Sequence, residues 1–136
     1  MITVFDRQKE VPSIDAWLAQ ARSAEDNGLR GMYLTHMGVV RQTSRARVRD
    51  NDENAPDVRG MILKSDGDKA EQCLKAAAGL PGITYARAWL NSGELKTGDP
   101  IMCVLIGGDT RPHVVDALQF LVQNLKEKCV SEAELN

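Results

Sequence analysis

The sequence predicts an α+β domain with a mixed, mainly antiparallel sheet and helices packed on one side. Three observations favour this class. Apolar residues recur at helical spacing in three segments, whereas other segments alternate or run apolar as strands do. The turn-rich segment 91–99 also joins the last two predicted strands closely enough for a hairpin. The expected order is therefore helix, strand, loop, strand, helix, strand, turn, strand and helix.

The N-terminal part of the chain holds the first helix, the first strand and a loop. Ser13 is a suitable N-cap for a helix that should end at the Asp26–Gly28 cluster. The segment 31–37 is rich in β-favouring residues, which predicts a strand followed closely by Arg41. Residues 42–57 carry many charges and almost nothing to bury, so they should form a mobile surface loop. That loop is either a lid or anion-gathering arm, or a solvated excursion without a role.

The remaining elements follow from the same patterns. Residues 58–63 form a short predicted strand, and Ser65 or Asp66 can cap the next helix, which ends at Gly79. Apolar and small residues alternate across 83–90, which predicts a third strand.

The last strand and helix carry the strongest signals. Residues 101–106 run apolar without alternation, as a strand buried on both faces would. Helical spacing of apolar residues then continues through 114–125, with Arg111 opening the helix and Lys126 closing it.

Composition restricts the class of protein. With 136 residues and 43% hydrophobic content, the chain is expected to be a single domain, residues 1–136. The net charge of −2 gives no global attraction to nucleic acid or anionic membranes. No membrane span or leader is recognisable, so a cytoplasmic protein is expected. Cys73, Cys103 and Cys129 lack CxxC spacing, so we expect reduced thiols, no metal site and no cofactor.

Arg111 and Lys126 are the first candidates for a functional site. Fifteen residues of helix at about 1.5 Å each separate them by roughly 22 Å, so one small substrate cannot contact both. A homodimer in which two such helices run antiparallel about a two-fold axis would bring Arg111 of one subunit toward Lys126 of the other.

Each candidate also has a simpler interpretation. The glycine-rich turn before Arg111 suits a phosphate, but Asp109 or Thr110 acting as an N-cap explains the same residues. Lys126 can complement a helix C-terminus, and Arg41 can be an exposed charge. His36 and His113 have no evident partner in the sequence and favour structural or surface roles.

Motifs in three regions, in the right order and spacing, resemble the catalytic large subunit of molybdopterin synthase. The resemblance covers about three quarters of the chain, from residue 28 to residue 128. The residues that carry it are Gly31–Arg41, then Gly93, Glu94, Leu95, Gly98 and Asp99, then Arg111, Gln119, Phe120, Leu125 and Lys126.

The resemblance implies an α/β hammerhead-like fold, a homodimer and a small ubiquitin-like sulfur-carrier subunit, together a heterotetramer. The implied reaction places two sulfurs, delivered by carrier thiocarboxylates, on cyclic pyranopterin monophosphate to form the molybdopterin dithiolene. It implies that Arg41 and Arg111 hold the phosphate and pterin, with Arg111 reaching across the dimer. Lys126 would hold the thiocarboxylate and assist proton transfer or a transient acyl intermediate.

The chain departs from the family pattern at several positions. Leu90 and Asn91 replace a histidine–arginine pair, Thr110 replaces a histidine, and 64–66 lack the expected glutamate and tyrosine. Residues 130–133 replace a segment that ends in a second catalytic lysine. His113, as a substrate-binding residue, and Lys128 are candidates to compensate. Three hypotheses therefore stand: a divergent sulfurtransferase, a non-catalytic relative that dimerises and binds the carrier or a pterin phosphate, and an unrelated α+β domain.

Overall fold

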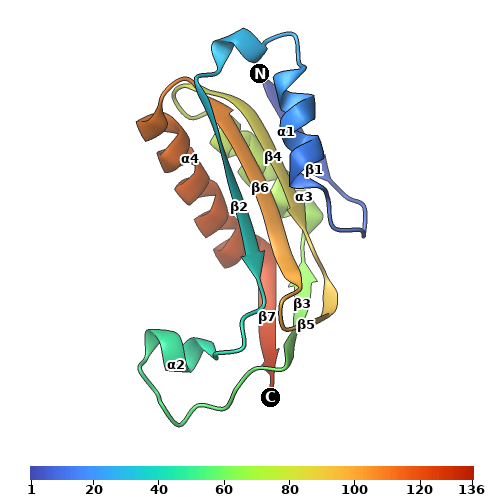
Figure 1. Ribbon diagram of the computed structural model, residues 1–136, viewed down its shortest axis with the longest axis vertical. Helices are drawn as coiled ribbons and strands as arrows, with labels where there is room; N and C mark the ends of the chain where they lie inside the picture. Colours follow the sequence, from blue (N-terminus) through green and yellow to red (C-terminus); the bar gives the residue numbers. More distant parts are fainter.

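The computed structural model describes residues 1–136 as a long sheet flanked by helices, with a second small sheet at one end (Figure 1). In chain order the elements are β1 (Ile2–Asp6), α1 (Ile14–Arg22), the 3₁₀ turn η1 (Asn27–Leu29), β2 (Met32–Val39), α2 (Arg45–Arg49), β3 (Gly60–Ser65), α3 (Gly67–Ala78), β4 (Ile83–Leu90), β5 (Gly93–Lys96), β6 (Pro100–Gly108), α4 (Arg111–Asn124), the π-helical segment η2 (Leu125–Cys129) and β7 (Val130–Leu135).

The central sheet has the strand order β1-β4-β6-β2. Only β1 and β4 run parallel, while β4–β6 and β6–β2 are antiparallel. The apolar run predicted for 101–106 lies inside β6, and residues 101–108 are all buried. The predicted hairpin is confirmed, since β4 and β6 are antiparallel neighbours. The α+β class with a mainly antiparallel sheet is therefore confirmed.

The second sheet is antiparallel throughout, with β3 between β5 and β7. Gly60 is required there because a Cβ atom at this position would collide with the carbonyl oxygen of Leu95 on β5. The segment predicted to be only a turn, 91–99, thus contributes strand β5 as well as two glycines, Gly93 and Gly98, with positive φ.

Helices cover both faces of the central sheet, which corrects the expectation of helices on one side. α3 and α4 pack on one face, where Leu74 and Leu121 meet Val104 in the larger core. α1 packs on the opposite face, where Trp17 contacts a smaller core that includes Trp89. The physical reason is that β6 is apolar on both faces and β4 carries buried apolar residues on both, so each face needs a cover.

Caps predicted from the sequence fix the starts of two helices. The Ser13 hydroxyl accepts a hydrogen bond from the Ala16 amide at 3.2 Å, and α1 begins at Ile14. The Asp66 carboxylate accepts one from the Lys69 amide at 3.1 Å, and α3 begins at Gly67. Each side chain satisfies a backbone donor that the first helical turn leaves free.

The strands β1, β5 and β7 and the α-helix α2 were not predicted, nor were the short segments η1 and η2. The segment expected to be a loop contains α2, which Ser44 caps by accepting from the Arg47 amide at 3.2 Å. Arg47 also pairs with Asp57 at 2.8 Å, so the charges of this segment partly bind one another. The mobility of the segment 42–57 stays a prediction. No helix of the chain has the length and apolar character needed to cross a membrane.

Candidate functional site

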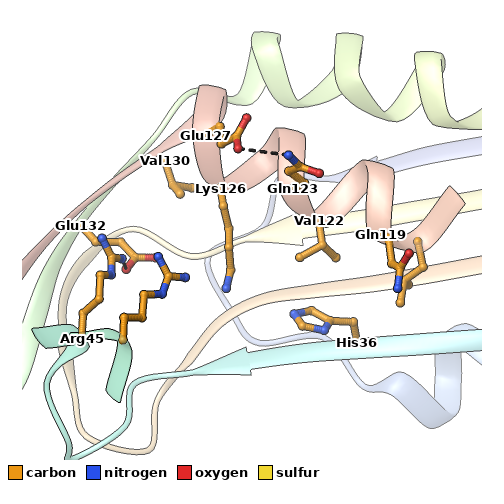
Figure 2. Close-up of a pocket in the computed structure, with 11 residues that line it drawn as sticks. His36, Arg45, Gln119, Val122, Gln123, Lys126, Glu127, Val130 and Glu132 are labelled. Atoms are coloured by element: carbon orange, nitrogen blue, oxygen red, sulfur yellow. Dashed lines mark hydrogen bonds and ion pairs between the residues drawn. The ribbon is translucent and has the colours of Figure 1, made fainter. Parts of the chain in front are cut away.

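A cavity of about 600 Å³ lies where the end of α4 and η2 face β2, α2 and β7 (Figure 2). Its lining combines three cations and two carboxylates with polar and apolar side chains: His36, Arg45, Arg49, Leu118, Gln119, Val122, Gln123, Lys126, Glu127, Val130 and Glu132. Five elements from distant parts of the sequence therefore form one cavity.

Lys126 is the cation that η2 contributes to the cavity. Leu125 and Cys129, the first and last residues of η2, are buried, and the exposed Lys126 stands between them. Figure 2 shows its side chain extending from the helix into the space between Arg45 and His36. It forms no ion pair, so its ammonium group is free to meet a ligand. π-helical turns are frequent at functional sites.

His36 lies opposite Lys126 on β2 and was not predicted to be part of a site. Its Nε2 atom is buried and has no hydrogen-bond partner. Burial lowers the pKa of His36, and the positive charge of Lys126 lowers it further. A neutral imidazole with an unpaired ring nitrogen can accept a proton from a ligand in the cavity.

Two further cations and a glutamate come from α2 and β7. Arg45 donates to Glu132 at 2.6 Å, and its backbone amide donates to Glu134 at 3.1 Å. Arg49 lines the same cavity without an ion pair. α2, within the segment 42–57, thus brings two guanidinium groups to the cavity, and an anion-gathering role for this segment stays a prediction.

Arg41 lines a small adjoining hollow of about 80 Å³ together with Lys126, Arg45 and Arg49. Its Nε donates to the Thr43 carbonyl at 3.0 Å, which leaves the Nη groups free. Across the cavity and the hollow, four cations face three carboxylates, Glu127, Glu132 and Glu134, so one positive charge is in excess. Arg41 and Lys126, two of the predicted site residues, are thus brought together.

Arg111 and His113 lie at the opposite end of α4 and line neither the cavity nor the hollow. His113 Nδ1 lies 2.8 Å from Asp109 Oδ1, an interaction that lowers the pKa of Asp109. Thr110 occupies the N-cap position without a capping hydrogen bond. Within one chain, these two predicted residues do not share a site with Lys126.

The positions that depart from the family pattern have local structural roles. Leu90 is buried, and the Asn91 side chain donates to the Pro100 carbonyl at 2.9 Å. Lys128 faces a different hollow, lined by Lys69 and Cys73, so it does not share the cavity with Lys126. The cavity therefore contains a single lysine.

Sequence reasoning missed His36, Arg45, Arg49 and Glu132 as members of the site. His36 was predicted to lie in a strand, and Arg45 and Arg49 within a charged loop, but nothing local linked them to Lys126. The alternating arginines of 45–49 were the only signal in the sequence.

Comparisons with known proteins agree with this architecture. A family model described as MoaE protein matches residues 8–128. The fold is similar to that of molybdopterin cofactor biosynthesis protein E from Burkholderia multivorans, with a TM-score of 0.73, 19% identity and coverage of 100% of this chain and 85% of that one. It is also similar to molybdopterin synthase from Staphylococcus aureus, with a TM-score of 0.70, 14% identity and coverage of 98% and 89%.

A third similar structure is the complex of subunits 1 and 2 of molybdopterin-converting factor from Helicobacter pylori, with a TM-score of 0.64, 12% identity and coverage of 90% of this chain and 75% of that one. No curated protein matches the sequence. The family match spans most of the chain and includes Arg41, Arg111 and Lys126. The chain therefore belongs to the MoaE family, the large subunits of molybdopterin synthase, which act in molybdenum cofactor biosynthesis.

Proposed function

We propose that the protein is a sulfurtransferase of the molybdopterin synthase type. It would take sulfur from the C-terminal thiocarboxylate of a small carrier protein and place it on cyclic pyranopterin monophosphate, forming the dithiolene. The observation that carries the proposal is the unpaired Lys126, which extends into a cation-rich cavity of about 600 Å³ in a chain of the MoaE family.

Charge explains why such a site suits this reaction. The substrate phosphate and the carrier thiocarboxylate are both anions, and they repel each other in one pocket unless cations are already there. Arg41, Arg45 and Arg49 provide guanidinium groups that suit phosphate contacts. Lys126 provides a compact ammonium group for the thiocarboxylate.

Proton transfer is the second requirement, and His36 is proposed to assist it. The neutral imidazole can accept a proton from the pterin when sulfur adds, and can return it afterwards. This assignment gives a function to a buried ring nitrogen that has no partner in the free protein.

A homodimer is part of the proposal, because it gives Arg111 and His113 a role. Both residues lie near the start of α4, with Arg111 about 20 Å from Lys126 in the same chain. A two-fold axis with antiparallel α4 helices would place Arg111 of a second copy near Lys126 and complete the phosphate site. A monomeric protein in solution would contradict this arrangement.

A small carrier subunit is the proposed second partner. The Helicobacter pylori structure contains subunits 1 and 2 of molybdopterin-converting factor as a complex. By analogy, we propose that a carrier subunit docks beside α2 and β7, and that its extended C-terminal tail enters the cavity toward Lys126.

A turnover assay tests the proposal directly. Purified protein, thiocarboxylated carrier and cyclic pyranopterin monophosphate should yield molybdopterin, detected by mass spectrometry. Lys126→Ala should abolish the product, whereas Lys128→Ala, on the same exposed segment but facing another hollow, should retain it. A wild-type protein that gives no product, or equal loss in both variants, would contradict the proposal.

A non-catalytic relative is the alternative function, and the single lysine of the cavity favours it. Leu90, Asn91 and Ala133 stand where the family pattern has cationic or histidine residues. This alternative expects a stable complex with the carrier on size-exclusion chromatography and no turnover. The same assay therefore distinguishes the two functions.

A further inference from the structure

Two of the three cysteines lie in contact, although they are 56 residues apart in the sequence. Cys73 belongs to α3 and Cys129 is the last residue of η2, and their sulfur atoms are 3.6 Å apart. A disulfide has an S–S distance of about 2.05 Å, so the sulfurs need to approach by only about 1.5 Å. Cys103, the third cysteine, lies in the core on the other face of the sheet.

The two thiols differ in their access to solvent. Cys73 is half-buried and lines a hollow of about 520 Å³ that also borders Lys69 and Lys128. Cys129 is 3% exposed and sits behind it. Burial raises the pKa of the Cys129 thiol to about 12, and its contact with Cys73 contributes to the increase. A small oxidant in the hollow therefore reaches Cys73 first, and the protonated thiol of Cys129 lies directly behind Cys73.

We propose that Cys73 and Cys129 form a reversible disulfide when the protein meets a peroxide. Hydrogen peroxide oxidises the Cys73 sulfur to a sulfenic acid and releases one water. Cys129 then gives up its proton, and its sulfur attacks the Cys73 sulfur, so that the new S–S bond forms while the S–O bond breaks. The leaving hydroxide combines with the proton of Cys129 to form a second water. Two thiols thus lose two electrons and two protons to one peroxide.

The position of Cys129 connects this reaction to the candidate site. Cys129 ends the π-helical segment that carries Lys126, and its carbonyl accepts a hydrogen bond from the Asp66 amide at 2.8 Å. Drawing its side chain toward α3 would alter the geometry of η2, the segment that also presents Lys126 to the cavity. The disulfide would therefore change the exposure of Lys126, and this effect does not depend on the reaction catalysed at the site.

Mass spectrometry of peroxide-treated protein tests the pairing. Digestion without reductant should give a peptide pair linked through Cys73 and Cys129, and dithiothreitol should restore both free thiols. Cys103→Ser should form the link as the wild type does, whereas Cys73→Ser and Cys73→Ala should not. A sulfinic acid at Cys73 without linkage, or links between chains only, would overturn the proposal.

The connection to Lys126 has its own measurement. The rate of reductive methylation of Lys126 should differ at least two-fold between oxidised and reduced wild-type protein. In Cys73→Ser, peroxide should leave that rate unchanged. Equal rates in the oxidised and reduced wild type would overturn the effect on the site, even if the disulfide forms. Neither measurement needs turnover, so failure here is distinguishable from failure of the proposed sulfur transfer.

Discussion

Glu132 should limit how strongly the cavity binds anions. It is a mostly buried carboxylate with a side-chain exposure of 13%, and it accepts a hydrogen bond from Arg45, one of the cations of the cavity. Glu132→Gln keeps the size of the side chain and removes its charge. The excess positive charge around the cavity and adjoining hollow would then rise from one to two. We therefore expect this variant to bind phosphate more tightly than the wild type.

The size of the effect follows from the dimensions of the cavity. A volume of about 600 Å³ corresponds to a sphere of roughly 5 Å radius, so an anion at its centre lies about 5 Å from the wall. One unit charge at that distance contributes about 1 kcal/mol in a water-like dielectric and about 3 kcal/mol at an effective dielectric constant of 20. Because Arg45 is half exposed, the smaller value applies, and affinity should increase about five-fold.

Isothermal titration calorimetry with inorganic phosphate at low ionic strength measures this change. Lys126→Gln should weaken binding by a similar factor, and both effects should shrink at about 1 M salt, where the Debye length is about 3 Å. The loss of the ion pair should cost at most about 1 kcal/mol in the free energy of unfolding, since Arg45 is half exposed. Unchanged or weaker phosphate binding by Glu132→Gln would refute the reasoning.

Two further predictions concern the framework and the histidine. Asp6 accepts hydrogen bonds from Arg87 at 2.9 Å and 3.0 Å and from the Trp17 indole at 3.1 Å. Asp6→Ala should lower the free energy of unfolding, measured in urea, by about 3 kcal/mol, because it leaves the largely buried guanidinium group of Arg87 without its carboxylate partner. Asp6→Asn should lower it by less. An equal loss in both variants would contradict a role for the charge. The pKa of His36 is lowered in the folded protein, so the unfolded chain binds a proton at this residue more readily. The free energy of unfolding should therefore fall as the pH drops below about 6.5, the ordinary pKa of histidine, and level off below the pKa of His36 in the folded protein. His36→Gln should remove most of this pH dependence of the free energy of unfolding. Lys126→Met should raise the pKa of His36, measured by NMR titration. An unchanged pKa of His36 in Lys126→Met would show that the ammonium group does not act on the imidazole.

The sequence by itself determined the elements whose signals are local. The unbroken apolar run of 101–106 determined β6, because a strand covered by helices on both faces needs apolar side chains on both. Ser13 determined where α1 begins, and the alternatives Ser65 and Asp66 placed the start of α3 within one residue, because a cap satisfies free backbone donors of its own helix. The motifs around Arg41 and Lys126 also indicated the family before any geometry was known.

Only the tertiary structure decided the edge strands and the composition of the cavity. β1 and β7 are short and partly polar, and they become strands by pairing with β4 and β3, far away in the sequence. His36, Arg45 and Glu132 join Lys126 for the same reason. The sequence around each of these residues is equally compatible with an ordinary strand or charged loop that has no functional site. Their function depends on distances between segments, which chain folding sets and which no local pattern encodes.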